Sequence, residues 1–205
     1  YEEFHFFDDL FNISAQKTLD FCDELERRGL RIIWDFRGRV NSITRESLER
    51  AKRAGCRMIS FGVETGSDEG LRMLKKATTV AMIRNAFKLC KEVGILTIAD
   101  YLIGLPHEKT PLDVMKNIDF LVHELDPDYA QFNILSLYPH TEIYEQAIRK
   151  GVIPPGRWRE FARNPTRDYR VDHWEEYMSL KELAALHAAA YRKFYFRPRY
   201  LWKNV

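Results

Sequence analysis

Short apolar runs alternate with amphipathic stretches along most of this chain, and this alternation restricts its fold more than any other feature. The apolar runs predict five strands, at residues 4–7, 31–36, 58–64, 95–103 and 130–137. The intervening segments carry apolar residues at helical spacing and several of them end at a glycine, as is typical of helices. Strands that alternate with helices in this way indicate βαβ units and a parallel sheet.

The number of predicted strands limits the architecture. A closed eightfold barrel needs about 250 residues, whereas this chain has 205 residues. An open or partial barrel, or a doubly wound sheet, therefore fits better. After residue 152 the pattern breaks, and residues 153–178 are expected to form an irregular cover. A capping box at Ser179–Glu182 opens a final helix, which we expect to end at 197–200 and to pack its aromatic residues on the sheet. We predict two parts, 1–152 and 153–205.

Composition excludes several classes of function. Lys and Arg number 32 against 30 Asp and Glu, so charge gives no argument for a nucleic-acid partner. No apolar run reaches the roughly 20 residues of a membrane span, and no signal peptide is evident, so we expect a cytoplasmic protein. Cys22, Cys56 and Cys90 are far apart and are expected to be buried thiols. The histidines show no metal-ligand spacing, and His107 and Glu108 are expected to shape a loop.

The candidate site lies where the predicted strands end, because ligands of parallel α/β proteins bind at the carboxyl ends of the strands. One strand delivers Glu64 to a polar Thr-Gly-Ser turn before a helix. A further carboxylate, Asp100, lies within the apolar run 98–103, where a charge is costly unless it is paired; a structural salt bridge is the alternative. The other polar residues at strand ends are Asp8, Asp9, Arg37, Arg39, Ser136 and Tyr138.

Charges of both signs at the carboxyl ends of the strands suit a zwitterionic ligand with hydroxyl groups. Carboxylates can hold an ammonium group or a ribose diol, and an arginine can hold a carboxylate through paired hydrogen bonds. The alternative for each residue is a helix-capping or surface charge. A metal- or phosphate-dependent barrel enzyme is disfavoured, because no His/carboxylate ligand set and no Gly-rich phosphate loop is evident.

Six segments together resemble one family. They are Phe-Phe-Asp-Asp-Leu-Phe (6–11), Trp-Asp-Phe-Arg-Gly-Arg-Val (34–40), Ala-Gly-Cys-Arg-Met-Ile-Ser-Phe-Gly-Val-Glu-Thr-Gly-Ser (54–67), Tyr-Leu-Ile-Gly-Leu-Pro-His-Glu (101–108), Asp-Pro-Asp-Tyr-Ala-Gln-Phe (126–132) and Tyr-Pro-His-Thr-Glu-Ile-Tyr (138–144). In order and spacing they resemble the radical S-adenosylmethionine (SAM) enzymes, closest to the class that often carries a cobalamin-binding domain in front. The resemblance covers nearly the whole chain, including its ending at 191–198.

The resemblance implies a partial parallel (β/α)6 TIM-like barrel that lacks its first β/α unit and has a C-terminal helical extension. It implies SAM bound to a [4Fe–4S] cluster, reduction by an external donor such as flavodoxin or ferredoxin, and a 5′-deoxyadenosyl radical. That radical would serve hydrogen abstraction or methyl transfer on a small-molecule substrate. Substrate and reaction type stay open, because fold does not fix them.

The resemblance also assigns roles to residues by their position in the motifs. Asp8 and Asp9 would meet the methionyl amino group, and Arg37 or Arg39 the carboxylate or a ribose hydroxyl. Glu64 and Asp100 match positions that contact the ribose in relatives. Backbone near Asn133 to Leu137, which includes Ser136, would edge the adenine.

The chain departs from the family in one respect. The CxxxCxxC loop that supplies the three iron ligands is absent. We expect these cysteines upstream, so that this chain is the C-terminal part of the radical domain and is inactive by itself; cobalamin would bind an upstream domain. The alternative is a relative without the cluster that binds SAM or a nucleotide without radical catalysis.

Overall fold

The computed structural model describes residues 3–8, 10–167 and 169–204. Its elements, in chain order, are β1 (Glu3–Phe6), α1 (Ala15–Arg27), β2 (Ile33–Gly38), η1 (Val40–Ser42), α2 (Arg45–Arg53), β3 (Cys56–Glu64), α3 (Asp68–Met73), α4 (Val80–Val93), β4 (Leu96–Ile103), α5 (Pro111–Asp119), η2 (Phe120–Leu125), β5 (Tyr129–Ile134), α6 (Glu142–Arg149), α7 (Arg157–Arg163), α8 (Leu180–Tyr195) and α9 (Pro198–Asn204). Among the described helices, none combines the length and the apolar character needed to cross a bilayer.

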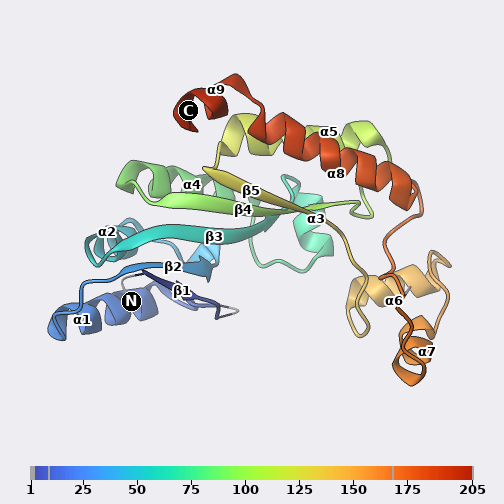
Figure 1. Cartoon of the computed structure of the whole chain (residues 1–205), viewed down its shortest axis with the longest axis horizontal. Coiled ribbons are helices and arrows are strands. Elements are labelled where there is room, and N and C mark those ends of the chain that lie inside the picture. The colour runs from blue at the N-terminus through green and yellow to red at the C-terminus, as the bar shows by residue number, and fades with distance from the viewer. Residues whose placement is uncertain (1–2, 9, 168, 205) are drawn as a thin grey trace.

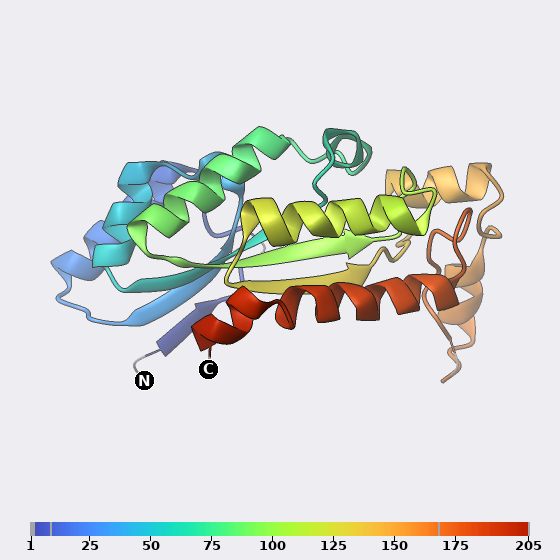
Figure 2. The same cartoon turned by 90° about the horizontal axis from the view of Figure 1, so that it is seen from above.

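The five strands form one parallel sheet in the order β1-β2-β3-β4-β5 (Figure 1). Helices α1, α2, α4 and α5 lie on one side of this sheet (Figure 2). In a doubly wound sheet the strand order reverses at a switch point, and here each strand pairs with the next one along the chain. The sheet is therefore a half-barrel, which confirms the predicted partial parallel barrel and excludes the doubly wound alternative.

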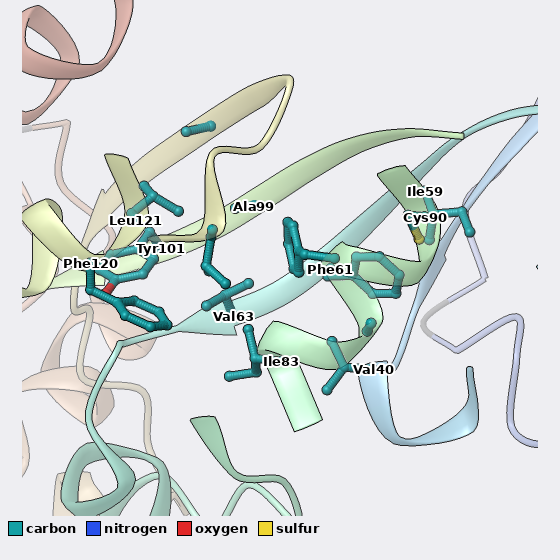
Figure 3. Close-up of a cluster of buried hydrophobic side chains, with 14 of the residues drawn as sticks. Val40, Ile59, Phe61, Val63, Ile83, Cys90, Ala99, Tyr101, Phe120 and Leu121 are labelled. Atoms are coloured by element: carbon teal, nitrogen blue, oxygen red, sulfur yellow. The ribbon is translucent and has the colours of Figure 1, made fainter. Parts of the chain in front are cut away.

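Alternate residues of each strand point to opposite faces of the sheet. On β3, Ile59, Phe61 and Val63 are fully buried against the helices, and Figure 3 shows them packed with side chains of α4 and β4. We call this side the helix face. Ser60 and Gly62, which alternate with them, and Glu64 at the end of the strand are only half-buried on the opposite side, the inner face.

Helix α8 covers the outer edge of β5. The Tyr195 hydroxyl donates to the carbonyl oxygen of Ala130 (2.8 Å) and accepts from its amide (3.2 Å). The Tyr191 hydroxyl accepts from the Phe132 amide (3.2 Å), and His187 Nε2 lies 2.9 Å from the Phe132 carbonyl oxygen. These side chains satisfy backbone groups that an edge strand would otherwise leave open, and they confirm the packing expected of the last helix.

Beyond β5 the chain builds a second, smaller apolar cluster. It consists of Leu105, Leu135, Leu137, Ile143, Tyr144, Ala147, Ile153 and Trp174. The expectation of a wholly irregular segment here was wrong, because α7 forms within it. Helix α7 is too short to show a periodic pattern, and tertiary contacts hold it: Trp158 Nε1 donates to the Leu137 carbonyl (3.3 Å), and the Phe161 ring stacks on Tyr169.

Helix α8 ends at Tyr195, close to the expected stop at 197–200. A further helix that the sequence did not predict, α9, begins at Pro198, a first position that proline tolerates well. The division into 1–152 and 153–205 stays a prediction.

Candidate functional site

A cavity of about 520 Å³ lies at the carboxyl ends of β2 and β3, within the usual size of small-molecule sites. One wall is the segment 37–41, which comprises the end of β2 and the residues after it, and the other is the loop 74–78 between α3 and α4. Asn41 Nδ2 donates to the Ala77 carbonyl oxygen (3.1 Å) and joins the two walls. The inner face of β3 and β4 forms the floor.

Four of the residues proposed from the sequence line this cavity: Arg37, Arg39, Glu64 and Asp100. Strand register accounts for the convergence, because Arg37 of β2 pairs with Ser60 of β3, and Gly62 of β3 pairs with Asp100 of β4. Two cations and two carboxylates from three strands and one loop thus share one cavity.

The other proposed residues lie elsewhere or cannot be placed. Asp8 follows β1, is exposed and does not line the cavity. Asp9 lies outside the described residues. On the β5 side, Asn133 is exposed, and Ser136 bridges to His173 instead of lining the cavity. The Tyr138 ring is exposed and contacts Trp158. Their predicted roles stay predictions.

Glu64 sits at a break in the regular pairing of β3 with β4 and has a positive φ of 65°. Such a conformation is uncommon for a residue other than glycine, and strained backbone is concentrated at functional sites. Its Oε1 accepts a hydrogen bond from Lys76 Nζ at 2.6 Å. Sequence reasoning missed Lys76, because it lies in a turn with no motif and approaches Glu64 only through the fold.

Asp100 has one satisfied oxygen and one that lacks a partner. Ser60 Oγ donates to Oδ2 (3.0 Å), while Oδ1 is buried and has no hydrogen-bond partner in the described part of the chain. Burial raises the pKa of this carboxyl, and the Ser60 hydrogen bond and the charges of Arg37 and Lys76 oppose the rise. No salt bridge to Asp100 occurs among the described residues, so the structural alternative finds no support. A buried oxygen that lacks a donor and borders a cavity is suited to a ligand.

The turn after Glu64 is shaped by close packing. A Cβ at Gly66 would lie 2.4 Å from the Phe120 ring, so only glycine fits there. Ser67 then caps α3 by accepting from the Gly70 amide. The Thr-Gly-Ser sequence is therefore explained by backbone geometry at the cavity's edge.

Glu108 shapes the loop after β4, as expected. Its Oε2 accepts from the amides of Gly104 (2.8 Å) and Leu105 (2.9 Å), and Oε1 accepts from Asn117 Nδ2 (2.7 Å). Burial raises the pKa of Glu108, and these hydrogen bonds oppose the rise. This carboxylate serves the backbone of the site and is not part of the cavity lining.

The three cysteines do not fit an iron–sulfur cluster. All three are buried and free. Burial raises the pKa of Cys22 to about 11 and that of Cys90 to about 12, and raises that of Cys56 as well. Cluster ligands are thiolates, whereas these groups are protonated core side chains, as predicted.

One polar cluster went unnoticed in the sequence. Ligand atoms of Glu3, His5 and Asp35 lie within 4.8 Å of one another, and His5 Nδ1 is 2.6 Å from Asp35 Oδ2. The expectation that the histidines have no partners at metal-ligand spacing was therefore wrong for His5. The contact joins β1 to β2 across 30 residues, which local spacing cannot reveal.

The fold and the cavity define a class: a parallel half-barrel with a charged cavity at its strand ends. Two solved structures share this fold. The radical SAM methyltransferase TsrM of Kitasatospora setae has a TM-score of 0.64 at 23% identity, over 72% of this chain and 28% of that one. The radical SAM enzyme HemN, the coproporphyrinogen III oxidase of Escherichia coli, has a TM-score of 0.64 at 15% identity, over 95% of this chain and 40% of that one.

Sequence comparison establishes the family. The profile of the radical SAM superfamily matches residues 3–120. An uncharacterized methyltransferase of Pyrococcus horikoshii is 30% identical over the whole chain, which covers 43% of that relative. The chain belongs to the radical SAM superfamily. It spans less than half the length of this curated relative.

Proposed function

We propose that this chain is the major part of a radical SAM enzyme domain and that its cavity binds SAM. The observation that carries the proposal is the convergence of Arg37, Arg39, Glu64 and Asp100 on one cavity of about 520 Å³. In a protein of this superfamily, such a cavity suits a sulfonium nucleoside that carries an ammonium, a carboxylate and a ribose diol.

Each polar group of the cavity suits one part of that ligand. Glu64 is held in place by Lys76, and its remaining lone pairs suit ribose hydroxyls. Asp100 Oδ1 lacks a donor among the described residues, and a hydroxyl would supply one. Arg37, Arg39 and Lys76 offer cations for the methionyl carboxylate. The ammonium would meet Asp8 and Asp9, and Ser136, Tyr138 and the backbone near Asn133 would lie toward the adenine.

The [4Fe–4S] cluster is proposed to be held by cysteines outside this chain, since the cysteines here do not fit it. Bound to the reduced cluster, SAM would supply a 5′-deoxyadenosyl radical. This chain's own residues bind and orient the cofactor, and the packed helix face excludes water from one side. The reaction on a small-molecule substrate would be hydrogen abstraction or methyl transfer, in line with the similarity to the methyltransferase TsrM and the oxidase HemN.

Further parts of the proposal concern the whole protein. The TsrM structure contains cobalamin and a [4Fe–4S] cluster, which supports a cobalamin-binding domain upstream in this protein too. An external electron donor such as flavodoxin or ferredoxin would reduce the cluster. We further propose that the protein works in the cytoplasm, where thiols stay reduced.

Two measurements on the full-length protein test the proposal. Equilibrium dialysis with radiolabelled SAM should show saturable binding, and its absence would overturn the assignment. Electron paramagnetic resonance after anaerobic reconstitution and reduction should show a [4Fe–4S]⁺ signal. Saturable SAM binding without that signal would instead favour the second candidate, a SAM-binding module without a cluster, which the unsuitable cysteines of this chain make worth testing.

A further inference from the structure

Asn12 is a fully buried polar residue in the segment between β1 and α1. It does not cap α1; Ser14 does, and its side chain accepts from the Lys17 amide. The Asn12 amide instead makes two hydrogen bonds to one residue. Its Oδ1 accepts from the Arg39 amide (2.7 Å), and its Nδ2 donates to the Arg39 carbonyl oxygen (3.0 Å).

We propose that Asn12 is a positioning residue of the cofactor cavity, whose side-chain amide clamps the backbone of Arg39 and thereby presents Arg37 and Arg39 to the ligand. The inference rests on the proposed function, because these cations matter only if the cavity binds SAM. A third hydrogen bond supports it: the Phe11 amide donates to the Arg37 carbonyl oxygen (3.2 Å). The segment after β1 thus holds the end of β2 by three hydrogen bonds.

Gly38 shows how closely this clamp is fitted. A Cβ at Gly38 would lie 2.7 Å from Asn12 Oδ1 and 2.8 Å from the Phe36 ring. Gly38 does not have a positive φ, so glycine is needed here for the close approach of the Asn12 amide and not for its conformational freedom. The Asn12 side chain lies directly against the backbone between the two arginines.

The clamp matters because the arginine side chains are not fixed by other contacts. Among the described residues no hydrogen bond or ion pair holds either guanidinium group, so the backbone of 37–39, which Asn12 holds, sets the point from which both side chains reach the cavity. Asn41 holds the far end of the same segment through the Ala77 carbonyl. Asn12 and Asn41 therefore fix the cavity wall at both ends, and Asn12 is the buried one.

Asn12→Asp isolates the donor half of the clamp. The carboxylate keeps an acceptor for the Arg39 amide but places a second acceptor against the Arg39 carbonyl oxygen. A protonated carboxyl can donate there and restore both bonds. Burial raises the pKa of the introduced group, while the charges of Arg37 and Arg39 oppose the rise. The full-length variant should bind radiolabelled SAM about tenfold more weakly than wild type at pH 8, or ~1.4 kcal/mol, and nearly as well as wild type at pH 5.

Two further variants and one further readout keep the test decisive. Asn164→Asp, at the exposed end of α7, is the control and should match wild type at both pH values. Gly38→Ala displaces the Asn12 amide without adding charge, so it should weaken binding similarly at both pH values. Hydrogen exchange at the Arg39 amide should be faster in Gly38→Ala at both pH values, and should stay close to that of wild type in Asn12→Asp, whose side chain still accepts from this amide.

The outcomes separate the clamp from the function. If folded Asn12→Asp binds like wild type at pH 8, or is equally weak at both pH values, the clamp is refuted. If Asn12→Asp does not fold by circular dichroism, Gly38→Ala decides: wild-type affinity refutes the clamp, and weaker binding with faster Arg39 exchange supports it. If wild type fails to bind SAM, the proposed function falls and the clamp falls with it. If wild type and all variants bind alike, only the clamp falls.

Discussion

The two faces of the sheet are built from the same strands but differ in role. The helix face packs apolar side chains, and the inner face carries polar groups beside the cavity. On the helix face of β3, Phe61 is fully buried among apolar side chains. One residue earlier on the inner face, Ser60 hydrogen-bonds Asp100 beside the cavity. Stability is concentrated on the first face, and binding groups with unsatisfied or strained geometry are concentrated on the second. The difference implies that substitutions at adjacent residues of one strand affect different properties: those on the helix face should lower stability, and those on the inner face should lower ligand affinity.

The largest expected effect is the loss of stability caused by a substitution that leaves a large cavity on the helix face. Phe61→Ala removes a fully buried ring that packs with Phe87 (ring centroids 5.4 Å apart). Its expected cost is about 3–5 kcal/mol of unfolding free energy, measured by urea denaturation. Ser60→Ala, its neighbour on the inner face, is the matched comparison; it removes one hydrogen bond to Asp100 and should cost about 1–2 kcal/mol. Equal losses in the two variants would contradict the division between the faces.

A change at the strained carboxylate should act mainly on binding. Glu64→Gln keeps the size of the side chain but removes the charge that pairs with Lys76 and would accept ribose hydroxyls. We expect SAM affinity to fall about tenfold or more, ~1.4 kcal/mol, while the urea midpoint changes little. Glu69→Gln, a carboxylate of α3 outside the cavity lining, is the control. A large loss of stability without a loss of affinity would place Glu64 in the structure and not in the site.

The pH dependence of stability should separate Asp100 from its amide analogue. The folded-state pKa of Asp100 is raised by burial, so its contribution to stability is present below the unfolded pKa and is lost as pH rises through the folded pKa. Asp100→Asn removes this dependence. The melting temperature of the variant, relative to wild type, should therefore rise between about pH 4 and pH 8. A difference that stays constant or falls with pH would contradict the burial argument.

The smallest expected effect is at the cap of α8, which lies outside both faces. Ser179 accepts from the Glu182 amide, and the Glu182 carboxylate accepts from the Ser179 amide in return. Ser179→Ala should cost about 1 kcal/mol in urea denaturation and leave SAM affinity unchanged. A change in affinity would show that the cap of α8 is coupled to the inner face.

Much of this organisation could be predicted from local sequence. The strands, the parallel sheet and the position of Glu64 and Asp100 follow from periodicity and from the rule that ligands bind at strand ends. Residues that act across long sequence distances could not be predicted. Asn12 meets Arg39 across 27 residues, and His5 meets Asp35 across 30. The short helix α7 could not be predicted either, because tertiary contacts stabilise it and its sequence has no repeating apolar pattern.

The most direct test of the central claim is an experimental structure of the full-length protein with SAM bound. The account predicts that the adenosyl group lies between segments 37–41 and 74–78, with the ribose hydroxyls within hydrogen-bond distance of Glu64 and Asp100. Density for SAM at any other part of the sheet, with this cavity filled only by water, would contradict it.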